Sequence, residues 1–149
     1  MKRSATAEWR GNLKQGQGFI NSESGSLSNL SYSFTKRFGG ERGTNPEELI
    51  GAAHASCFAM AVSAELENQK LTAESIHVRA SVNLEQVNGN WEIPAIHLEI
   101  NIAASGVEEN KIRTAAESAK ANCPVSKLLS SARISMNLSI SNEEFIPVQ

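Results

Sequence analysis

Three segments in the second half of the chain alternate between apolar and polar residues with a period of two. In residues 76–84 the even positions are apolar and the odd positions are mostly polar, and residues 96–102 and 134–140 repeat the pattern. Because successive side chains of a strand point to opposite faces, this period predicts strands with one buried face each.

The connection between the first two of these strands has two readings. Asn88-Gly89 is typical of a two-residue hairpin turn. With that turn alone, even positions would pair with odd ones, and apolar residues would stand opposite polar residues across the ladder. A three-residue loop at residues 88–90, or a bulge near Pro94, would restore the match.

A long helix is predicted to begin at residue 46 and to be apolar on every face. Asn45 is a favourable N-cap, Pro46 fits the first helical position, and Glu48 stands at the third, where a capping box has a carboxylate. A helix that is apolar all round has to be buried on all sides. One sheet of a small chain cannot cover it, so we expect a second subunit to do so.

The remaining elements complete an α+β pattern. A second helix is predicted over residues 108–122, with an apolar stripe that turns Cys123 inward, and Pro124 interrupts it. Short segments punctuated by Gly and Ser predict a meander: residues 5–10, 17–23 and 27–35. The order βββ-α-ββ-α-β predicts an α+β fold with an antiparallel sheet and a central buried helix. No linker is visible, so residues 1–149 are expected to form a single domain.

Composition excludes several classes of function. A net charge of -2 over 149 residues gives no electrostatic basis for binding nucleic acid or an anionic membrane. The first residues carry charge without an apolar core, so we expect no signal peptide, and no window approaches the roughly 18 apolar residues of a membrane span. A cytoplasmic protein is therefore expected. In that reducing compartment two cysteines are more often catalytic, redox-active or inert than structural.

Cys57 lies in the most apolar stretch and is the first candidate for chemistry. A thiol reacts as its thiolate, which burial on a helix disfavours, so a cation has to be delivered to it. Arg37 and Arg42, in a loop predicted at residues 36–45, are candidates, and Glu47 is free to orient one of them. Taken alone, such a cysteine is commonly a small hydrophobic residue, and a first-turn glutamate commonly interacts with the helix dipole.

The positions of Glu47 and Cys57 on one helix constrain any shared site. They are ten residues apart, or about 15 Å along a straight helix. They can share a site only if the helix breaks or if two such helices pair antiparallel in a dimer. His54 shares a helix face with Cys57, which allows a dyad or metal site, although a packed histidine is more common. Two distant cysteines make a poor zinc site, and the glycines at 39, 40 and 43 form no phosphate-loop or dinucleotide-binding pattern.

Three segments together resemble the OsmC/Ohr family of bacterial thiol peroxidases, and in particular its OsmC branch. They are Arg37-Phe38, the run from Gly43 to Phe58, and Cys123-Pro124-Val125-Ser126. The resemblance extends over nearly the whole chain, including the order of elements. It implies an OsmC-like fold, an intertwined homodimer with two sites at the subunit interface, and no metal or bound cofactor.

The resemblance also implies a role for each candidate. Cys57 would be the peroxidatic cysteine and Cys123 the resolving one, while Arg37 would activate the thiolate and polarise the peroxide, and Glu47 would hold Arg37. Cys57 would become a sulfenic acid and condense with Cys123, and an external dithiol, such as a lipoyl protein, would reduce the disulfide. The implied function is reduction of organic hydroperoxides and hydrogen peroxide in oxidative and osmotic stress.

Two other classes of function stay open from the residues alone. One is a thiol redox sensor or binding module that forms the disulfide without turnover. The other is a hydrolase or acyltransferase with a Cys57–His54 dyad, which would need an oxyanion hole that no pattern indicates. The expected lining of the site is apolar and favours an alkyl hydroperoxide: Phe38, Ile50, Phe58 and Met60.

Overall fold

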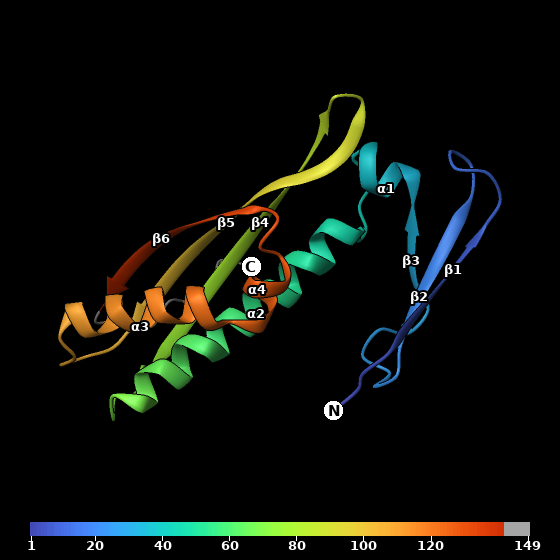
Figure 1. Ribbon diagram of the computed structural model, residues 1–149. Helices are drawn as coiled ribbons and strands as arrows, with labels where there is room; N and C mark the ends of the chain where they lie inside the picture. The colour runs from blue at the N-terminus through green and yellow to red at the C-terminus, as the bar shows by residue number, and fades with distance from the viewer. Residues whose placement is uncertain (142–149) are drawn as a thin grey trace. The chain divides into compact units, whose positions relative to one another are not determined.

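The structure is a computed structural model that describes residues 1–141, and the chain divides into two compact units, one up to Leu49 and one from Ile50 onwards. The first unit contains β1 (Ala5–Arg10), β2 (Gln17–Ser22), β3 (Leu30–Ser33), α1 (Phe34–Phe38) and the first residues of α2 (Pro46–Asn68). The second contains the rest of α2, β4 (Ser75–Val87), β5 (Asn90–Ala103), α3 (Glu109–Asn122), α4 (Pro124–Leu128) and β6 (Arg133–Ser141) (Figure 1).

The first unit is built on the predicted meander. β2 pairs antiparallel with both β1 and β3, so Gly18 lies between Trp9 and Tyr32. A Cβ atom on Gly18 would lie 2.3 Å from the Tyr32 ring. The absence of a side chain there lets the rings of Trp9 and Tyr32 approach to a centroid distance of 5.5 Å.

Helix α1 occupies part of the segment that the sequence pattern assigned to a loop. The Ser33 hydroxyl caps it by accepting a hydrogen bond from the Lys36 N–H at 3.2 Å. The rings of Phe34 and Phe38 pack on one side with centroids 4.9 Å apart. Arg37 therefore lies on a short helix and not, as expected, in a loop, which restricts the directions that its side chain can take.

The predicted start of α2 is confirmed. The Glu48 N–H donates to the Asn45 side-chain oxygen at 2.9 Å, as an N-cap requires, and Pro46 is the first helical residue. The Glu48 carboxylate accepts a hydrogen bond from the Thr44 hydroxyl at 2.9 Å. Glu48 is thus held by its own loop.

One stripe of α2 is buried within the chain, and the rest is not. The buried residues recur every three or four positions: Gly51, His54, Phe58, Val62 and Leu66. Met60, on another face, is 75% exposed, so a single chain leaves apolar residues of α2 uncovered, as the sequence led us to expect. By length and composition α2 could also cross a membrane, contrary to our expectation, although core helices of soluble proteins meet the same criterion.

The sheet of the second unit has the order β4-β5-β6. The β4–β5 pair is antiparallel, and Ile76 lies opposite Ile102. The β5–β6 pair is parallel, with Ile96 opposite Ile134, which corrects the expectation of an antiparallel sheet. The reason is the connection: α3 and α4 carry the chain back along the sheet, so β6 enters in the same direction as β5.

The β4–β5 hairpin combines two features that the sequence offered separately. Asn88 and Gly89 form a two-residue turn with φ values of 52° and 84°, and Val87 pairs directly with Asn90. The register then shifts beside Leu84, where two residues of β5, Ile93 and Pro94, occupy the space of one. The bulge near Pro94 is confirmed, the three-residue loop was wrong, and apolar residues face one another along the rest of the ladder.

The core of the second unit lies between its sheet and its long helices. Phe58 and Leu66 of α2 and Ile112 of α3 pack on the even-numbered residues of β5, such as Leu98. Both helices therefore cover the same face of the sheet (Figure 1). The stripe predicted for the second helix is confirmed and buried: Ile112, Ala115, Ala116 and Ala119.

Candidate active site

Cys57 and Cys123 come together in the second unit. Their sulfur atoms lie 3.3 Å apart, with Cys123 as donor, and both residues are free thiols. Cys57 is half-buried on α2, whereas Cys123 is completely buried. A disulfide between them needs little movement because the two side chains already face each other.

The break between α3 and α4 places Cys123. Its N–H still completes α3 by donating to the Ala119 carbonyl at 2.8 Å. The next residue, Pro124, has no N–H and disfavours helical geometry before it, so Cys123 takes an extended conformation with φ -53° and ψ 123°. Pro124 then starts α4. The predicted interruption is confirmed, and it turns the Cys123 side chain from the end of α3 towards α2.

Charge on the two sulfurs is shaped by burial and by the first turn of α4. Burial raises the pKa of the Cys57 thiol, and the neighbouring Cys123 raises it further. Burial acts in the same direction on Cys123, but the Ser126 N–H, the Ser126 hydroxyl and the Val125 N–H outweigh it and lower its pKa. The two thiols titrate as a pair, and a charge held on Cys57 requires a further cation.

Arg37 and Glu47 form a bidentate ion pair in the first unit. The Arg37 Nε donates to one carboxylate oxygen at 3.1 Å and Nη2 donates to the other at 2.5 Å. The Glu47 side chain is only 11% exposed, so water competes weakly for it. The guanidinium also lies 5.1 Å from the centroid of the Phe38 ring. Held on two sides, Arg37 still has N–H donors for a ligand.

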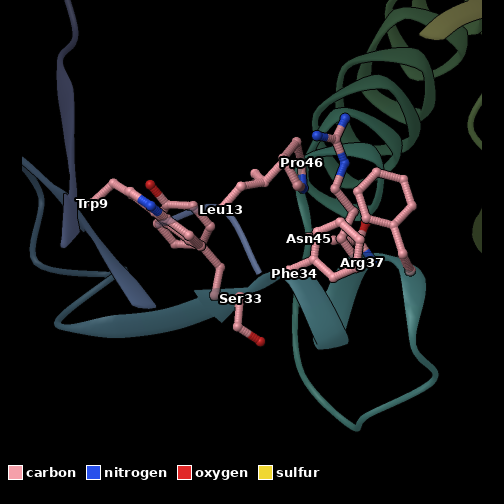
Figure 2. A pocket seen from close by; sticks show the side chains of 9 residues that line it. Trp9, Leu13, Ser33, Phe34, Arg37, Asn45 and Pro46 are labelled. Atoms are coloured by element: carbon pink, nitrogen blue, oxygen red, sulfur yellow. The ribbon is translucent and has the colours of Figure 1, made fainter. Parts of the chain in front are cut away.

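An apolar pocket of about 260 Å³ lies beside Arg37 within the first unit (Figure 2). Its lining residues come from the meander, α1 and the start of α2: Trp9, Leu13, Tyr32, Ser33, Phe34, Arg37, Phe38, Asn45 and Pro46. Phe38 thus lines a pocket as expected. Phe58 does not, because it is 0% exposed in the core. The pocket combines aromatic walls with one cationic group that can bind an oxygen atom.

The four predicted site residues therefore form two pairs. Cys57 and Cys123 contact each other in the second unit, and Arg37 and Glu47 contact each other in the first. Arg42, the alternative cation, lies exposed in the segment before α2. Chemically, one pair can cycle between dithiol and disulfide, and the other can present a positive charge to an anionic or polar ligand.

His54 and Ser126 form a buried polar pair next to the thiols. His54 is 0% exposed, and its Nε2 lies 2.8 Å from the Ser126 hydroxyl oxygen. Burial lowers the pKa of His54, so the ring is neutral at pH 7. The hydrogen bond of the His54 ring goes from Nε2 to Ser126 and not to Cys57. The structure therefore shows no Cys57–His54 dyad.

Sequence reasoning missed Ser126, although the signal was present. Ser126 follows Cys123 by three positions, which is the spacing of an N-cap and the third helical residue.

The residues of the chain that the structure describes hold no cluster of three or more metal-ligating side chains.

Comparison with known proteins gives consistent similarities. The family model described as OsmC-like protein matches residues 39–139. The chain is 45% identical over 123 residues to the peroxiredoxin OsmC of Escherichia coli, covering 83% of this chain and 86% of that protein. It is 36% identical over 89 residues to an organic hydroperoxide resistance protein of Xanthomonas axonopodis, covering 58% and 60%.

Solved structures share the fold. The crystal structure of an organic hydroperoxide resistance protein from Elizabethkingia anophelis aligns with a TM-score of 0.72 at 26% identity, covering 96% of this chain and 99% of that one. An OsmC-like protein of Vibrio cholerae aligns with a TM-score of 0.75 at 17% identity, covering 93% and 99%.

Proposed function

This chain belongs to the OsmC-like family, and we propose that it is a thiol peroxidase that reduces organic hydroperoxides through Cys57 and Cys123. The observation that carries the proposal is the 3.3 Å contact between two free thiols, one half-exposed and one buried. The half-buried Cys57 thiol can react with a substrate, whereas the buried Cys123 thiol can reach only Cys57. That asymmetry is what a peroxidatic and a resolving cysteine require.

The first half-reaction uses Cys57 and Arg37. The Cys57 thiolate attacks one oxygen of the hydroperoxide, the O–O bond breaks, and the alkoxide leaves with its electron pair and takes up a proton to become the alcohol. Cys57 is oxidised to a sulfenic acid. The Arg37 guanidinium stabilises both the thiolate and the departing alkoxide, because negative charge moves from sulfur to oxygen in this step.

The second half-reaction closes the cycle. The Cys123 sulfur attacks the Cys57 sulfenic acid, a disulfide forms, and the hydroxyl group leaves as water. An external dithiol then reduces the disulfide by exchange. We propose a lipoyl-type dithiol as the reductant and the cytoplasm as the compartment, since a disulfide that forms in each cycle depends on a steady supply of reducing equivalents.

We propose further that the active unit is an intertwined homodimer of this single-domain chain, in which Arg37 and Glu47 of one subunit serve Cys57 of the other. Two observations support this. α2 is one continuous helix, so about 15 Å of helical rise separates Glu47 from Cys57. The apolar residues of α2 outside its buried stripe, including Met60 at 75% exposure, gain cover if a second copy packs on them.

The pocket beside Arg37 supports an organic substrate. Its walls are mostly aromatic and aliphatic side chains, and Arg37 is the charged residue among its lining. Transfer of an alkyl or aryl group from water to such walls is favourable, whereas hydrogen peroxide has no apolar part to bury. We therefore expect a higher kcat/KM for bulky organic hydroperoxides than for hydrogen peroxide.

Steady-state turnover tests the function. Cumene hydroperoxide, tert-butyl hydroperoxide and hydrogen peroxide are each supplied with a lipoyl or a simple dithiol, and peroxide loss is measured for the parent protein, Cys57→Ser and Cys123→Ser. Many turnovers by the parent and none by Cys57→Ser are expected. Consumption of only one equivalent of peroxide per site, with every reductant, would instead identify a redox sensor. Undiminished turnover by Cys57→Ser would reject the proposed chemistry.

A further inference from the structure

The buried pair of His54 and Ser126 has no role in the two half-reactions described above. Burying two polar side chains costs the fold free energy, which indicates that the pair serves a function. Both side chains lie in the interior, at 0% and 4% exposure, among the residues of the second unit. Their hydrogen bond joins α2 to the first turn of α4 across 72 positions of the chain. Burying two polar groups costs free energy that one hydrogen bond offsets only in part.

The hydrogen-bond partners of His54 decide which ring nitrogen carries the proton. Nε2 faces the Ser126 oxygen at 2.8 Å, and Nδ1 is buried with no partner among the described residues. A buried N–H without an acceptor is less tolerated than a bare acceptor nitrogen. The proton therefore lies on Nε2, and His54 donates to the Ser126 oxygen. The hydroxyl proton of Ser126 is then directed away from the ring.

The Cys123 sulfur is the acceptor that we assign to the Ser126 hydroxyl. Cys123 stands at the N-cap position of α4, without a side-chain capping hydrogen bond, and Ser126 is the third residue of that helix, so both side chains belong to its first turn. In agreement, the Ser126 hydroxyl contributes to lowering the pKa of the Cys123 thiol. Hydrogen bonds join His54 to Ser126 and Cys123 to Cys57, and the first turn of α4 connects the two pairs.

We infer that His54 and Ser126 are positioning residues for the second half-reaction, in which His54 holds the Ser126 hydroxyl so that it donates to the Cys123 sulfur. This inference rests on the proposed function. Cys123 loses its proton, its sulfur attacks the sulfenic sulfur of Cys57, the S–S bond forms as the S–O bond breaks, and the hydroxide takes up a proton to leave as water. The hydroxyl stabilises the Cys123 thiolate before the attack, as a hydrogen bond to a charged group does.

The two half-reactions separate this role from a structural one. Ser126→Ala is mixed with one equivalent of cumene hydroperoxide, and samples are quenched at intervals. Sulfenic acid at Cys57 is trapped with dimedone, and the disulfide is counted by mass spectrometry. Loss of one hydrogen bond to a thiolate is expected to slow disulfide formation by about tenfold or more. Formation of the sulfenic acid is expected to stay within about twofold of the parent, so trapped Cys57 accumulates.

Two further variants test the path through Ser126. His54→Leu is expected to slow the same step, and combining it with Ser126→Ala should add little, because His54 acts only through the hydroxyl. His54→Gln keeps a side-chain N–H and should recover part of the rate. The matched control is Ser135→Ala, which removes the hydroxyl of a second histidine–serine pair, 2.8 Å from His97 Nδ1 on the polar face of the sheet. It should leave both steps unchanged.

Several outcomes would overturn the inference. Disulfide formation by Ser126→Ala at the parent rate removes the role of the hydroxyl, and equal slowing of both steps assigns the pair to folding. Additive losses in the double variant mean that His54 does not act through Ser126. These results leave the peroxidase itself intact. If the parent forms no sulfenic acid with any hydroperoxide, both the proposed function and this inference fall.

Discussion

The Cys123 thiol donates a hydrogen bond to the Cys57 sulfur at 3.3 Å, although the two residues are 66 positions apart in the chain. The contact joins the middle of α2 to the break between α3 and α4, two places that neighbour each other only because both helices pack on the same face of one sheet. A rigid core thus sets the distance between the two sulfurs, so we expect disulfide formation to require rotation of side chains and no rearrangement of helices.

Peroxide is expected to convert the two thiols into an intrachain Cys57–Cys123 disulfide. The sulfurs are already in contact, and the buried position of Cys123 keeps it away from thiols of other molecules. Mass spectrometry of the oxidised protein, digested without reductant, should show the peptides of the two cysteines linked. Cys123→Ser should instead retain a trappable sulfenic acid. A Cys57–Cys57 link, or two thiols that stay free, would contradict the assignment.

Arg37→Ala should reduce kcat/KM far more than Arg42→Ala does. Arg37 is fixed by Glu47 and Phe38 and lines the pocket, whereas Arg42 is exposed. Removing one group that stabilises developing charge typically costs on the order of a hundredfold in rate. Peroxide consumption by the two variants under identical conditions makes the comparison, and Arg42→Ala serves as the matched loss of one positive charge. Equal losses in both would refute the role of Arg37.

Glu47 should act through Arg37, and across the subunit boundary. Homodimers of Cys57→Ser and of Glu47→Ala should each have reduced activity. A heterodimer of one Cys57→Ser subunit and one Glu47→Ala subunit should contain one intact site, because both substitutions fall in its other site. Subunits are mixed under mild denaturation and refolded, heterodimers are isolated by differential tags, and light scattering at low concentration reports their mass. A heterodimer with no more activity than its parents would place each site within a single chain.

The stability of the protein should decrease as the pH falls below about 6.5, in part because of His54. Burial lowers the pKa of His54, so the unfolded chain binds a proton in a pH range in which the folded chain stays neutral. The unfolded state then binds more protons, so the free energy of unfolding falls with falling pH, until the pH reaches the lowered pKa of the folded state. Above about pH 6.5 the contribution is complete.

Urea unfolding checks this prediction. The drop in midpoint between about pH 7.5 and pH 5.5 should be smaller in His54→Gln than in the parent, since glutamine does not titrate. His97→Gln is the control, because it removes a half-buried imidazole from the polar face of the sheet in the same unit. An identical pH dependence in the parent and His54→Gln would show that burial of His54 has no effect on stability.

Local patterns predicted most of the elements correctly, since their causes are local. The Asn45 cap, the alternation of Ile76 to Leu84 and the interruption at Pro124 depend on residues a few positions apart. Helix α1 was missed because it is only five residues long and is fixed by the Ser33 cap and a Phe34–Phe38 contact. A helix of that length has almost no periodicity to detect.

Features that join distant parts of the chain were harder to predict. The parallel direction of β6 depends on how the chain returns along the sheet through α3 and α4, which no pattern within β6 contains. The hairpin required both a two-residue turn and a bulge at Pro94, and each alone satisfied only part of the pattern. The core, rather than the turn, decided the register, because a slip of one residue would have exposed every apolar side chain.

For the site, residue types and local patterns identified the side chains that can carry chemistry: two thiols, an arginine with a first-turn glutamate, and a histidine beside Cys57. The family resemblance already implied a Cys57–Cys123 pair, and the structure brings their sulfurs to 3.3 Å. Tertiary packing alone shows that Phe58 belongs to the core and that His54 contacts Ser126. The reactions open to a side chain follow from its residue type, which the sequence states, whereas its pKa and reactivity depend on its surroundings. Its burial and its partners are set by packing between segments that lie far apart in the chain.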